Sequence, residues 1–474
     1  MSHLLELKNM NPLWWIGTHL LLVSGFGLCV FLIARVFREH RAAPVTFAWL
    51  LAIILIPYLG VPAYLIFGGR KLRGVGVRKT SLFPASHTQP HADPMVTAIE
   101  RVLTTAGMPP VREQNQVTFL PDGQAAYRSL VSLVEGAERS IQLMTFILGH
   151  DSTGKSIVDL LAKKAAAGVE VRLLLDALGC FRTYGRFVDP IRQAGGKVGV
   201  FMPVLPLRRK WSANLRNHRK VLVVDDNTAV VGGMNLANEY LGPEADPTRW
   251  IDTGAVIAGP AARDLERLFA NDWNYATGET IPCPDVVETA SSSADRGELV
   301  QIAASGPDTP RDAIYEAMFT ATMEARERIW LVTPYFVPDE TLFKALTLRS
   351  RLGVDVRIIL PAHSNHMLAD LARAQFLRDL AADGAKIHTC RRMIHAKLML
   401  FDRRLAVVGS ANVDVRSMYL NFEVAATMYS PATIDVIERW MRARMSESHT
   451  PDLTPANLWR GAAETLSSLV APLL

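Results

Sequence analysis

Two long apolar runs open the chain. Pro12–Ala34 and Val45–Phe67 are each 23 residues long and contain no Asp, Glu, Lys or Arg. A helix needs about 20 apolar residues to cross the hydrocarbon core of a bilayer, so the pattern predicts two transmembrane helices, at about 12–34 and 45–67, in a membrane anchor over residues 1–70. A cleaved signal peptide has a shorter apolar region. Pro57 and Pro62 should distort the second helix.

Basic residues flank both runs. Arg35, Arg38 and Arg41 lie between them, and Lys8 precedes the first. Five more follow the second run: Arg70, Lys71, Arg73, Arg78 and Lys79. A two-helix hairpin places six of these cations on one side of the membrane and three on the other. The positive-inside rule then puts the rest of the chain in the cytoplasm. Residues 71–112 are expected to be a linker, since 80–112 are rich in Pro, His and Thr.

The remaining chain is an internal repeat. Ser140–Asp176 and Arg328–Pro361 each read as a strand, a loop, an amphipathic helix and a strand. We expect a first half at 113–280, a linker at 281–297 and a second half at 298–474. Strands that alternate with helices indicate an α/β architecture. The first half has about 12 extra residues near Leu205–Leu215, whose basic residues beside Trp211 suit an anionic membrane surface or a solvated loop equally well.

A short motif occurs once in each half. It reads His218-Arg219-Lys220 with Asp225 five positions later, and His395-Ala396-Lys397 with Asp402 five positions later. Each motif reads as a strand, and residues i and i+2 of a strand share a face. In both copies an Asn follows the His by 17 residues (235 − 218 = 17 and 412 − 395 = 17). A single His-x-Lys pair is typical of a surface strand, but two copies with one spacing favour a functional site.

Each motif strand is expected to turn back on itself. Turns near residues 226 and 403 place His218 opposite residue 234 and His395 opposite residue 411. The predicted neighbours of the two histidines are then the Gly-rich turns and their amides: Gly233, Asn235, Ser410 and Asn412. Imidazole, ammonium, amide and close backbone suit a phosphoryl group. Asp225 and Asp402 complete the motif but face away from the histidines, so they favour a turn or structural role over a catalytic one.

Composition narrows the partners only slightly. The formal net charge is +5 and the pI is near 9.0, which suits a lipid or nucleic-acid partner, or simply a solvated surface. Two membrane helices disfavour nucleic acid. The four cysteines show no pairing pattern, which indicates a reducing compartment for the soluble part and no thiolate metal site. No metal or other cofactor is expected, because Lys220 and Lys397 supply the positive charge.

The doubled H-x-K-x4-D-x6-G-[GS]-x-N pattern resembles the phospholipase D superfamily. Weaker segments resemble bacterial cardiolipin synthases: Pro57–Phe67, Gly232–Leu241, Ser305–Asp308, Thr333–Asp339, Asn421–Glu423 and Ala471–Leu474. The resemblance implies two α-β-α sandwich halves related by a pseudo-twofold axis, with one active site between them. Relatives often read Trp-Arg-Asp where this chain has Trp250-Ile251-Asp252, which keeps the acid and leaves the role of the middle residue open.

The resemblance also implies a chemistry. A phosphatidyl group passes from one phosphatidylglycerol to another through a phosphatidyl-histidine, which gives cardiolipin and glycerol at the bacterial inner membrane. By analogy His218 is the nucleophile and His395 the acid and base, with Glu423 orienting His395 and Asp252 orienting His218. The loop Tyr335–Pro338 is expected either to line the lipid entrance or simply to pack. The alternatives are a phospholipase D-type hydrolase, a transferase that uses phosphatidylethanolamine as donor, and a non-catalytic lipid-binding scaffold.

Overall fold

The computed structural model describes residues 12–38, 43–67, 83, 91–203, 215–283, 297–309, 311–455 and 457–470. These fall into two compact units, Met1–Arg70 and Lys71–Leu474, which are described separately. The basic insertion that the sequence suggested for a membrane surface, near Trp211, lies outside the described residues.

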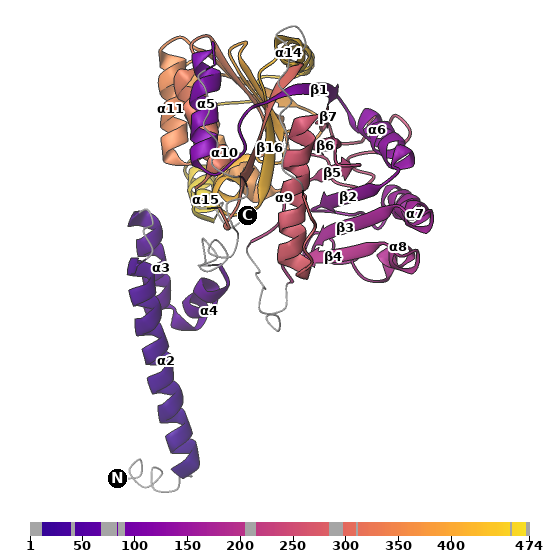
Figure 1. Ribbon diagram of the computed structural model, residues 1–474. Coiled ribbons are helices and arrows are strands. Elements are labelled where there is room, and N and C mark those ends of the chain that lie inside the picture. Colours follow the sequence, from indigo (N-terminus) through magenta and orange to yellow (C-terminus); the bar gives the residue numbers. More distant parts are fainter. Residues whose placement is uncertain are drawn as a thin grey trace, which may run out of the picture. The chain divides into compact units, whose positions relative to one another are not determined.

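The described part of the first unit contains three helices, α2 (Pro12–Arg38), α3 (Ala43–Leu55) and α4 (Pro57–Phe67). Among the described residues, one stretch, His19–Phe37 in α2, is long and apolar enough to cross a membrane. The second apolar run is broken at Ile56, because the following Pro57 has no N–H with which to continue the helix. The predicted distortion is confirmed at Pro57, where the expected second transmembrane helix divides into two shorter ones (Figure 1). Pro62 lies inside α4 and does not interrupt it.

The second unit is built on one mixed sheet of 14 strands, seven from each half. Its order is β12-β11-β9-β13-β14-β16-β8-β1-β7-β6-β5-β2-β3-β4. The first half supplies β1 (Arg112–Leu120), β2 (Ser140–Thr145), β3 (Glu170–Asp176), β4 (Lys197–Phe201), β5 (Val221–Val224), β6 (Thr228–Gly232) and β7 (Gly254–Ala258). The second half supplies β8 (Glu298–Ser305), β9 (Arg328–Val332), β11 (Asp355–Pro361), β12 (Lys386–Cys390), β13 (Leu398–Phe401), β14 (Leu405–Gly409) and β16 (Glu423–Met428).

The strand order reads the same from both edges once the repeats are matched, so the sheet has the pseudo-twofold symmetry that the repeat predicts. The halves meet where β1 pairs antiparallel with β8. A separate two-stranded ladder pairs β10 (Phe336–Val337) with β15 (Val413–Asp414). The α/β fold with two homologous halves is therefore confirmed.

Helices cover both faces of the sheet. In the first half, α6 (Gly123–Gly136), α7 (Ser152–Ala166) and α8 (Asp189–Gln193) lie on one face and α9 (Pro260–Thr277) lies on the other (Figure 1). The second half carries α10 (Ala313–Glu324), α11 (Glu340–Arg351), α12 (Met367–Ala382), α13 (Val415–Tyr419), α14 (Pro431–Ser446) and α15 (Leu458–Val470). Leu222 and Val224 of β5 join one apolar core, and Val221 and Val223 join the other. Strands buried on both faces are continuous apolar runs for this reason.

One further helix, α5 (Pro94–Thr105), lies within the range expected to be a linker. It packs against α10 of the second half. Asp93 caps its N-terminus by accepting from the N–H of Met95 and also pairs with Arg404. The apolar spacing of α5 places Met95, Ile99 and Leu103 in the core. The final part of the range 71–112 thus belongs to the folded unit.

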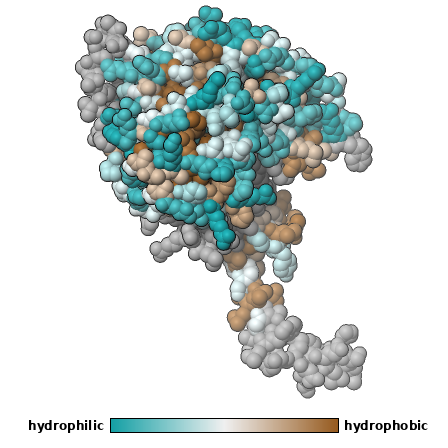
Figure 2. Space-filling view, turned by 90° about the vertical axis from the view of Figure 1, so that its right-hand side faces the viewer, coloured by the Kyte–Doolittle hydropathy of each residue, from teal (hydrophilic) through white to brown (hydrophobic). Residues whose placement is uncertain are grey.

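The surfaces of the two units differ in character. On the face shown in Figure 2, hydrophilic residues dominate the surface of the second unit, whereas hydrophobic residues lie at the surface of the described helical unit. In that helical unit the side chains of Leu21, Phe26 and Leu59 are 74%, 73% and 70% exposed. Such exposure of large apolar side chains fits a lipid environment and not water.

Candidate active site

Each His-x-Lys motif leads into a central strand that turns back as predicted. Val221 of β5 pairs with Val231 of β6, and Leu398 of β13 pairs with Val408 of β14. Continued by three residues, these registers place His218 opposite Met234 and His395 opposite residue 411. The predicted register is confirmed in both halves. It follows from the tight turns alone, since an antiparallel hairpin fixes which residues lie across from each other.

The two halves exchange short parallel bridges beside the motifs. The N–H of His218 donates to the carbonyl of Phe422 over 2.9 Å, and the N–H of His395 donates to the carbonyl of Ile251 over 2.7 Å. Each acceptor residue directly precedes a buried carboxylate, Glu423 or Asp252. Each histidine is therefore bound to the chain segment that carries the acid of the opposite half.

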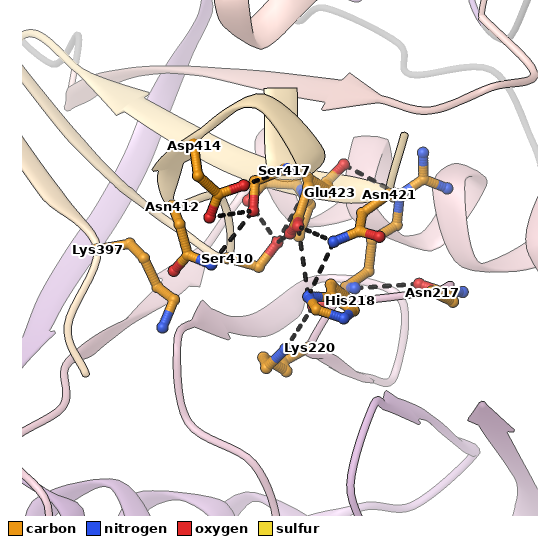
Figure 3. Close-up of polar contacts among 12 residues, drawn as sticks. Asn217, His218, Lys220, Lys397, Ser410, Asn412, Asp414, Ser417, Asn421 and Glu423 are labelled. Atoms are coloured by element: carbon orange, nitrogen blue, oxygen red, sulfur yellow. Dashed lines mark hydrogen bonds and ion pairs between the residues drawn. The ribbon is translucent and has the colours of Figure 1, made fainter. Parts of the chain in front are cut away.

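The carboxylates consequently pair across the interface. Oδ2 of Asp252 lies 2.7 Å from Nδ1 of His395. Oε1 of Glu423 lies 3.5 Å from Nδ1 of His218 (Figure 3). The expectation that Glu423 orients His395 and Asp252 orients His218 is wrong, because the bridges cross between the halves. Asn421 adds a contact to His218 Nδ1 at 3.3 Å. With Nδ1 facing a carboxylate, Nε2 is the ring nitrogen that faces away from the acid, and in His395 it lies 3.0 Å from Nζ of Lys397.

One cavity joins the two motifs. It has a volume of about 860 Å³ and is lined by both histidines and both lysines. Asn235, Asn412 and Ser410 also line it. The structure therefore brings the His, Lys and Asn residues of both motifs to one cavity. Lys220 and Lys397 each curl back so that the ammonium donates to the carbonyl of the histidine two residues earlier.

The backbone N–H groups of Gly233 and Ser410 are directed into the sheet and not toward a phosphate in the cavity. Their N–H groups donate to the carbonyls of Thr253 and Val424 in the sheet, so these donors are already used. A Cβ at Gly233 would lie 2.4 Å from a carboxylate oxygen of Asp252. The hydroxyl of Ser410 donates to Oε2 of Glu423 over 2.5 Å. Gly233 therefore leaves room for the Asp252 carboxylate, and the Ser410 hydroxyl holds that of Glu423.

Asp225 and Asp402 occupy equivalent turns away from the cavity. The carboxylate of Asp402 accepts from the N–H groups of residues 326, 327 and 328 at 2.8–3.2 Å. That of Asp225 accepts from those of residues 138, 139 and 140 at 2.8–2.9 Å. Both have a left-handed backbone, with φ of 52° and 50°, which Asp tolerates better than most residues. The structural interpretation of these aspartates agrees with this geometry.

Burial controls the protonation of the site. Desolvation, followed by the charge of Lys397, lowers the pKa of His395 to about 4, although Asp252 opposes the shift. Desolvation lowers the pKa of Lys397 to about 7 and that of Lys220 to about 8. It also raises the pKa of Glu423 to about 7. A bound phosphate would favour the cationic forms by its negative charge.

Several cavity residues were not identified from the sequence. Phe146 packs on His218 with ring centroids 4.1 Å apart, and Tyr240 and Trp250 lie 5.0 and 5.6 Å from the ring of His395. Arg416 of α13 also lines the cavity. In the sequence, Arg416 is marked only by a difference between the repeats. The two motifs are offset by 177 residues, and the first half has Glu239 at the matching position (416 − 177 = 239).

The loop expected at a lipid entrance does reach the cavity. Tyr335 and Val337 both line it, and the hydroxyl of Tyr335 contacts Oδ1 of Asn365 over 2.5 Å. Within the described part of the chain, no three His, Cys, Asp or Glu side chains are grouped so as to hold a metal ion.

Comparison with known proteins identifies the family. The family model described as cardiolipin synthase, PLD-like domain, matches residues 130–273 and 318–445, and a phospholipase D-nuclease N-terminal model matches 27–69. The chain is 32% identical to the cardiolipin synthase of Geobacillus kaustophilus over 97% of its own length and 95% of that protein. It is 30% identical to cardiolipin synthase A of Pseudomonas entomophila, over 92% and 94% of the two chains.

A solved structure shares the fold. Phosphatidylserine synthase from Haemophilus influenzae aligns with a TM-score of 0.61 at 16% identity, over 80% of this chain and all of that one. With near full-length coverage by curated relatives and the doubled motif around one cavity, the chain belongs to the cardiolipin synthase family of the phospholipase D superfamily.

Proposed function

We propose that this chain is a phosphatidyltransferase that converts two molecules of phosphatidylglycerol into cardiolipin and glycerol. The observation that carries the proposal is the pair of histidine–carboxylate contacts that cross between the halves and face one cavity beside two lysines. Covalent catalysis needs one group to attack and a second to move protons. The full-length similarity to curated cardiolipin synthases supports phosphatidylglycerol as donor and acceptor.

The first step forms a covalent intermediate. Nε2 of His218 attacks the phosphorus of a bound phosphatidylglycerol, the bond from phosphorus to the glycerol oxygen breaks, and His395 delivers a proton to the departing glycerol. Lys220 and Lys397 neutralise the non-bridging oxygens, and Asn235 and Asn412 donate hydrogen bonds to them. The assignment of His218 as nucleophile rests on analogy with the family.

The second step reverses these roles on a new lipid. His395 removes a proton from a headgroup hydroxyl of a second phosphatidylglycerol, whose oxygen attacks the phosphorus and displaces Nε2 of His218. The bond to histidine breaks as the bond to oxygen forms, so atoms and charge balance and the reaction is reversible. General acid–base help of this kind contributes on the order of 10²–10⁴-fold.

The helical unit supports a lipid partner. Large apolar side chains are exposed on α2, α3 and α4, and the anchor carries many flanking cations that suit an anionic bilayer. We place the catalytic unit on the cytoplasmic side of a bacterial inner membrane by the positive-inside rule. No nucleic acid is required by this scheme.

The test uses purified full-length protein in mixed micelles with headgroup- and acyl-labelled phosphatidylglycerol. Cardiolipin and free glycerol in equal amounts support the proposal. Phosphatidic acid as the main lipid product would replace it with a hydrolase, and cardiolipin formed only after phosphatidylethanolamine is added would change the donor. Full turnover by His218→Ala or His395→Ala would exclude the shared site.

A further inference from the structure

The two short helices of the second apolar run fold back on each other. A Cβ built on Gly60 would lie 2.0 Å from the carbonyl oxygen of Ala52, so the backbone of α4 touches that of α3 at this point. The rings of Trp49 and Tyr64 meet edge to face with centroids 5.3 Å apart. Residues 15 apart along a straight helix are separated by about 22 Å, so the run does not continue as one rod.

The fold-back returns the end of α4 to the C-terminal end of α2, where α3 begins. Tyr64 is 2% exposed and packs with Leu32 and Val36, which lie in the last two turns of α2. The guanidinium of Arg35 lies 5.9 Å from the centre of the Tyr64 ring. Arg35 is the first charged residue after the apolar run of α2, so it marks the end of that span. The end of α4 and the start of α3 therefore both lie at this end of α2.

The turn itself suits a lipid environment. Pro57 has no N–H to satisfy, and the carbonyl of Ile56 accepts from the N–H groups of residues 59 and 60. Lipid-embedded backbone must be satisfied internally in this way. The side chains around the turn are apolar and exposed, with Leu55, Tyr58 and Leu59 at 70%, 88% and 70%. Helix α3 has 13 residues and is about 20 Å long, which is less than the roughly 30 Å of a hydrocarbon core.

The charges of the chain agree with a single crossing. With two spans, Lys8 would share a side with the five cations after the second run, six positive charges against three. With one span and a fold-back, the three connector arginines join those five. The distribution becomes eight positive charges on one side and Lys8 alone on the other. Positive charge is concentrated on the cytoplasmic side of membrane proteins, so this arrangement satisfies the rule far better.

We infer that α3 and α4 form a re-entrant hairpin that dips into the bilayer from the cytoplasmic side, so that α2 is the one crossing among the described helices and the N-terminus lies outside. The exposed apolar side chains of the turn then insert into the lipid bilayer. The cytoplasmic side follows the proposed location of the catalytic unit, whereas the fold-back does not depend on it.

The sidedness is tested in full-length protein whose four cysteines are replaced by alanine and which retains activity. Single cysteines are then introduced as Ser2→Cys or Ser81→Cys, and right-side-out vesicles are treated with a membrane-impermeant maleimide. We expect labelling of the Ser2→Cys protein from outside and of the Ser81→Cys protein only after permeabilisation. Labelling of both from the same side would overturn the re-entrant hairpin. The reverse pattern, with only Ser81→Cys labelled from outside, would keep the hairpin and refute the cytoplasmic site.

The fold-back has its own test in the same cysteine-free background. The pair Trp49→Cys and Tyr64→Cys is expected to be joined intramolecularly by a short bis-maleimide in membranes. The matched pair Leu22→Cys and Phe37→Cys has the same 15-residue separation on the unbroken α2 and should not be joined. Absence of the first cross-link, with activity retained, would mean that residues 45–67 run straight.

Discussion

Nδ1 of His395 lies 2.7 Å from Oδ2 of Asp252, a carboxylate that belongs to the other half of the repeat. Glu423 stands in the corresponding place beside His218, at 3.5 Å. Neither half therefore holds a complete histidine–carboxylate pair. The site exists only when the two halves are joined along β1 and β8, which explains why the repeat is retained as one chain with one cavity.

The crossed pairing predicts which substitution affects which histidine. Asp252 raises the pKa of His395 against the effect of burial, so Asp252→Asn should lower that pKa further and leave His218 unchanged. Turnover should fall by about 10²–10⁴-fold, as when a histidine loses its orienting carboxylate. The measurement is an imidazole titration by NMR, with kcat alongside it.

Glu423→Gln is the matched control for this prediction. It should perturb the resonance of His218 and spare that of His395. If Asp252→Asn moved the titration of His218 instead, the assignment of pairs within each half would be restored and the crossed geometry would be wrong.

Deprotonation of the two cavity lysines is expected to cause the fall of kcat/KM at basic pH. Burial lowers the pKa of Lys397 to about 7 and that of Lys220 to about 8. Because the ammonium forms bind phosphate, their loss as pH rises through these values should raise KM for phosphatidylglycerol. In Lys397→Arg the guanidinium keeps its charge, so the basic limb of kcat/KM should shift to higher pH even though the maximum rate falls. An unchanged basic limb in this variant would assign it to another group.

Substitution of either motif aspartate is expected to lower the stability of the protein and not the rate of the chemical step. Asp402 is 3% exposed and accepts from three successive N–H groups. Asp402→Ala should destabilise the catalytic unit by about 1–3 kcal/mol, because those donors lose their buried acceptor. Asp225→Ala should cost less, since that carboxylate is only partly buried. Denaturant unfolding measures the loss, and a kcat reduced a hundredfold with unchanged stability would contradict the structural role.

The sequence predicted what local geometry determines. The hairpins that follow His218 and His395 could be placed because strand parity and a tight turn fix the neighbours of each residue. The crossed carboxylates could not, since the contact of Ile251 with the segment before His395 depends on how the two halves meet. Pro57 predicted a distorted helix, but the direction of the next helix is set by Gly60 packing on Ala52. Those are tertiary contacts that no local pattern contains.

Arg416 predicts a substrate-binding contribution that breaks the symmetry of the repeat. It lines the cavity near enough to His218 for its charge to lower the pKa of that histidine. Arg416→Gln should raise KM for anionic phosphatidylglycerol more than it lowers kcat, because a cation that attracts the lipid phosphate acts before the chemical step. Arg311→Gln, which removes an exposed cation outside the cavity, is the control. Equal effects of the two variants would show that Arg416 acts only through the overall charge.

Arg219, the middle residue of the first motif, is predicted to connect the halves. Its guanidinium is fully buried, pairs with Asp272 at 2.6 Å and donates to the carbonyl of Glu423 over 3.1 Å. Arg219→Met should destabilise the protein by about 3–5 kcal/mol, because it removes the cation that neutralises the buried Asp272 carboxylate.

Most of that stability should return in Arg219→Met/Asp272→Leu, where no unpaired charge remains. Activity should not return with it, since the carbonyl of Glu423 still lacks the donor that fixes the backbone beside His218. Unfolding free energy and kcat measured on both variants separate these two effects. Full recovery of kcat in the double variant would reduce Arg219 to a stabilising residue, whereas recovery of stability alone makes it a positioning residue for Glu423.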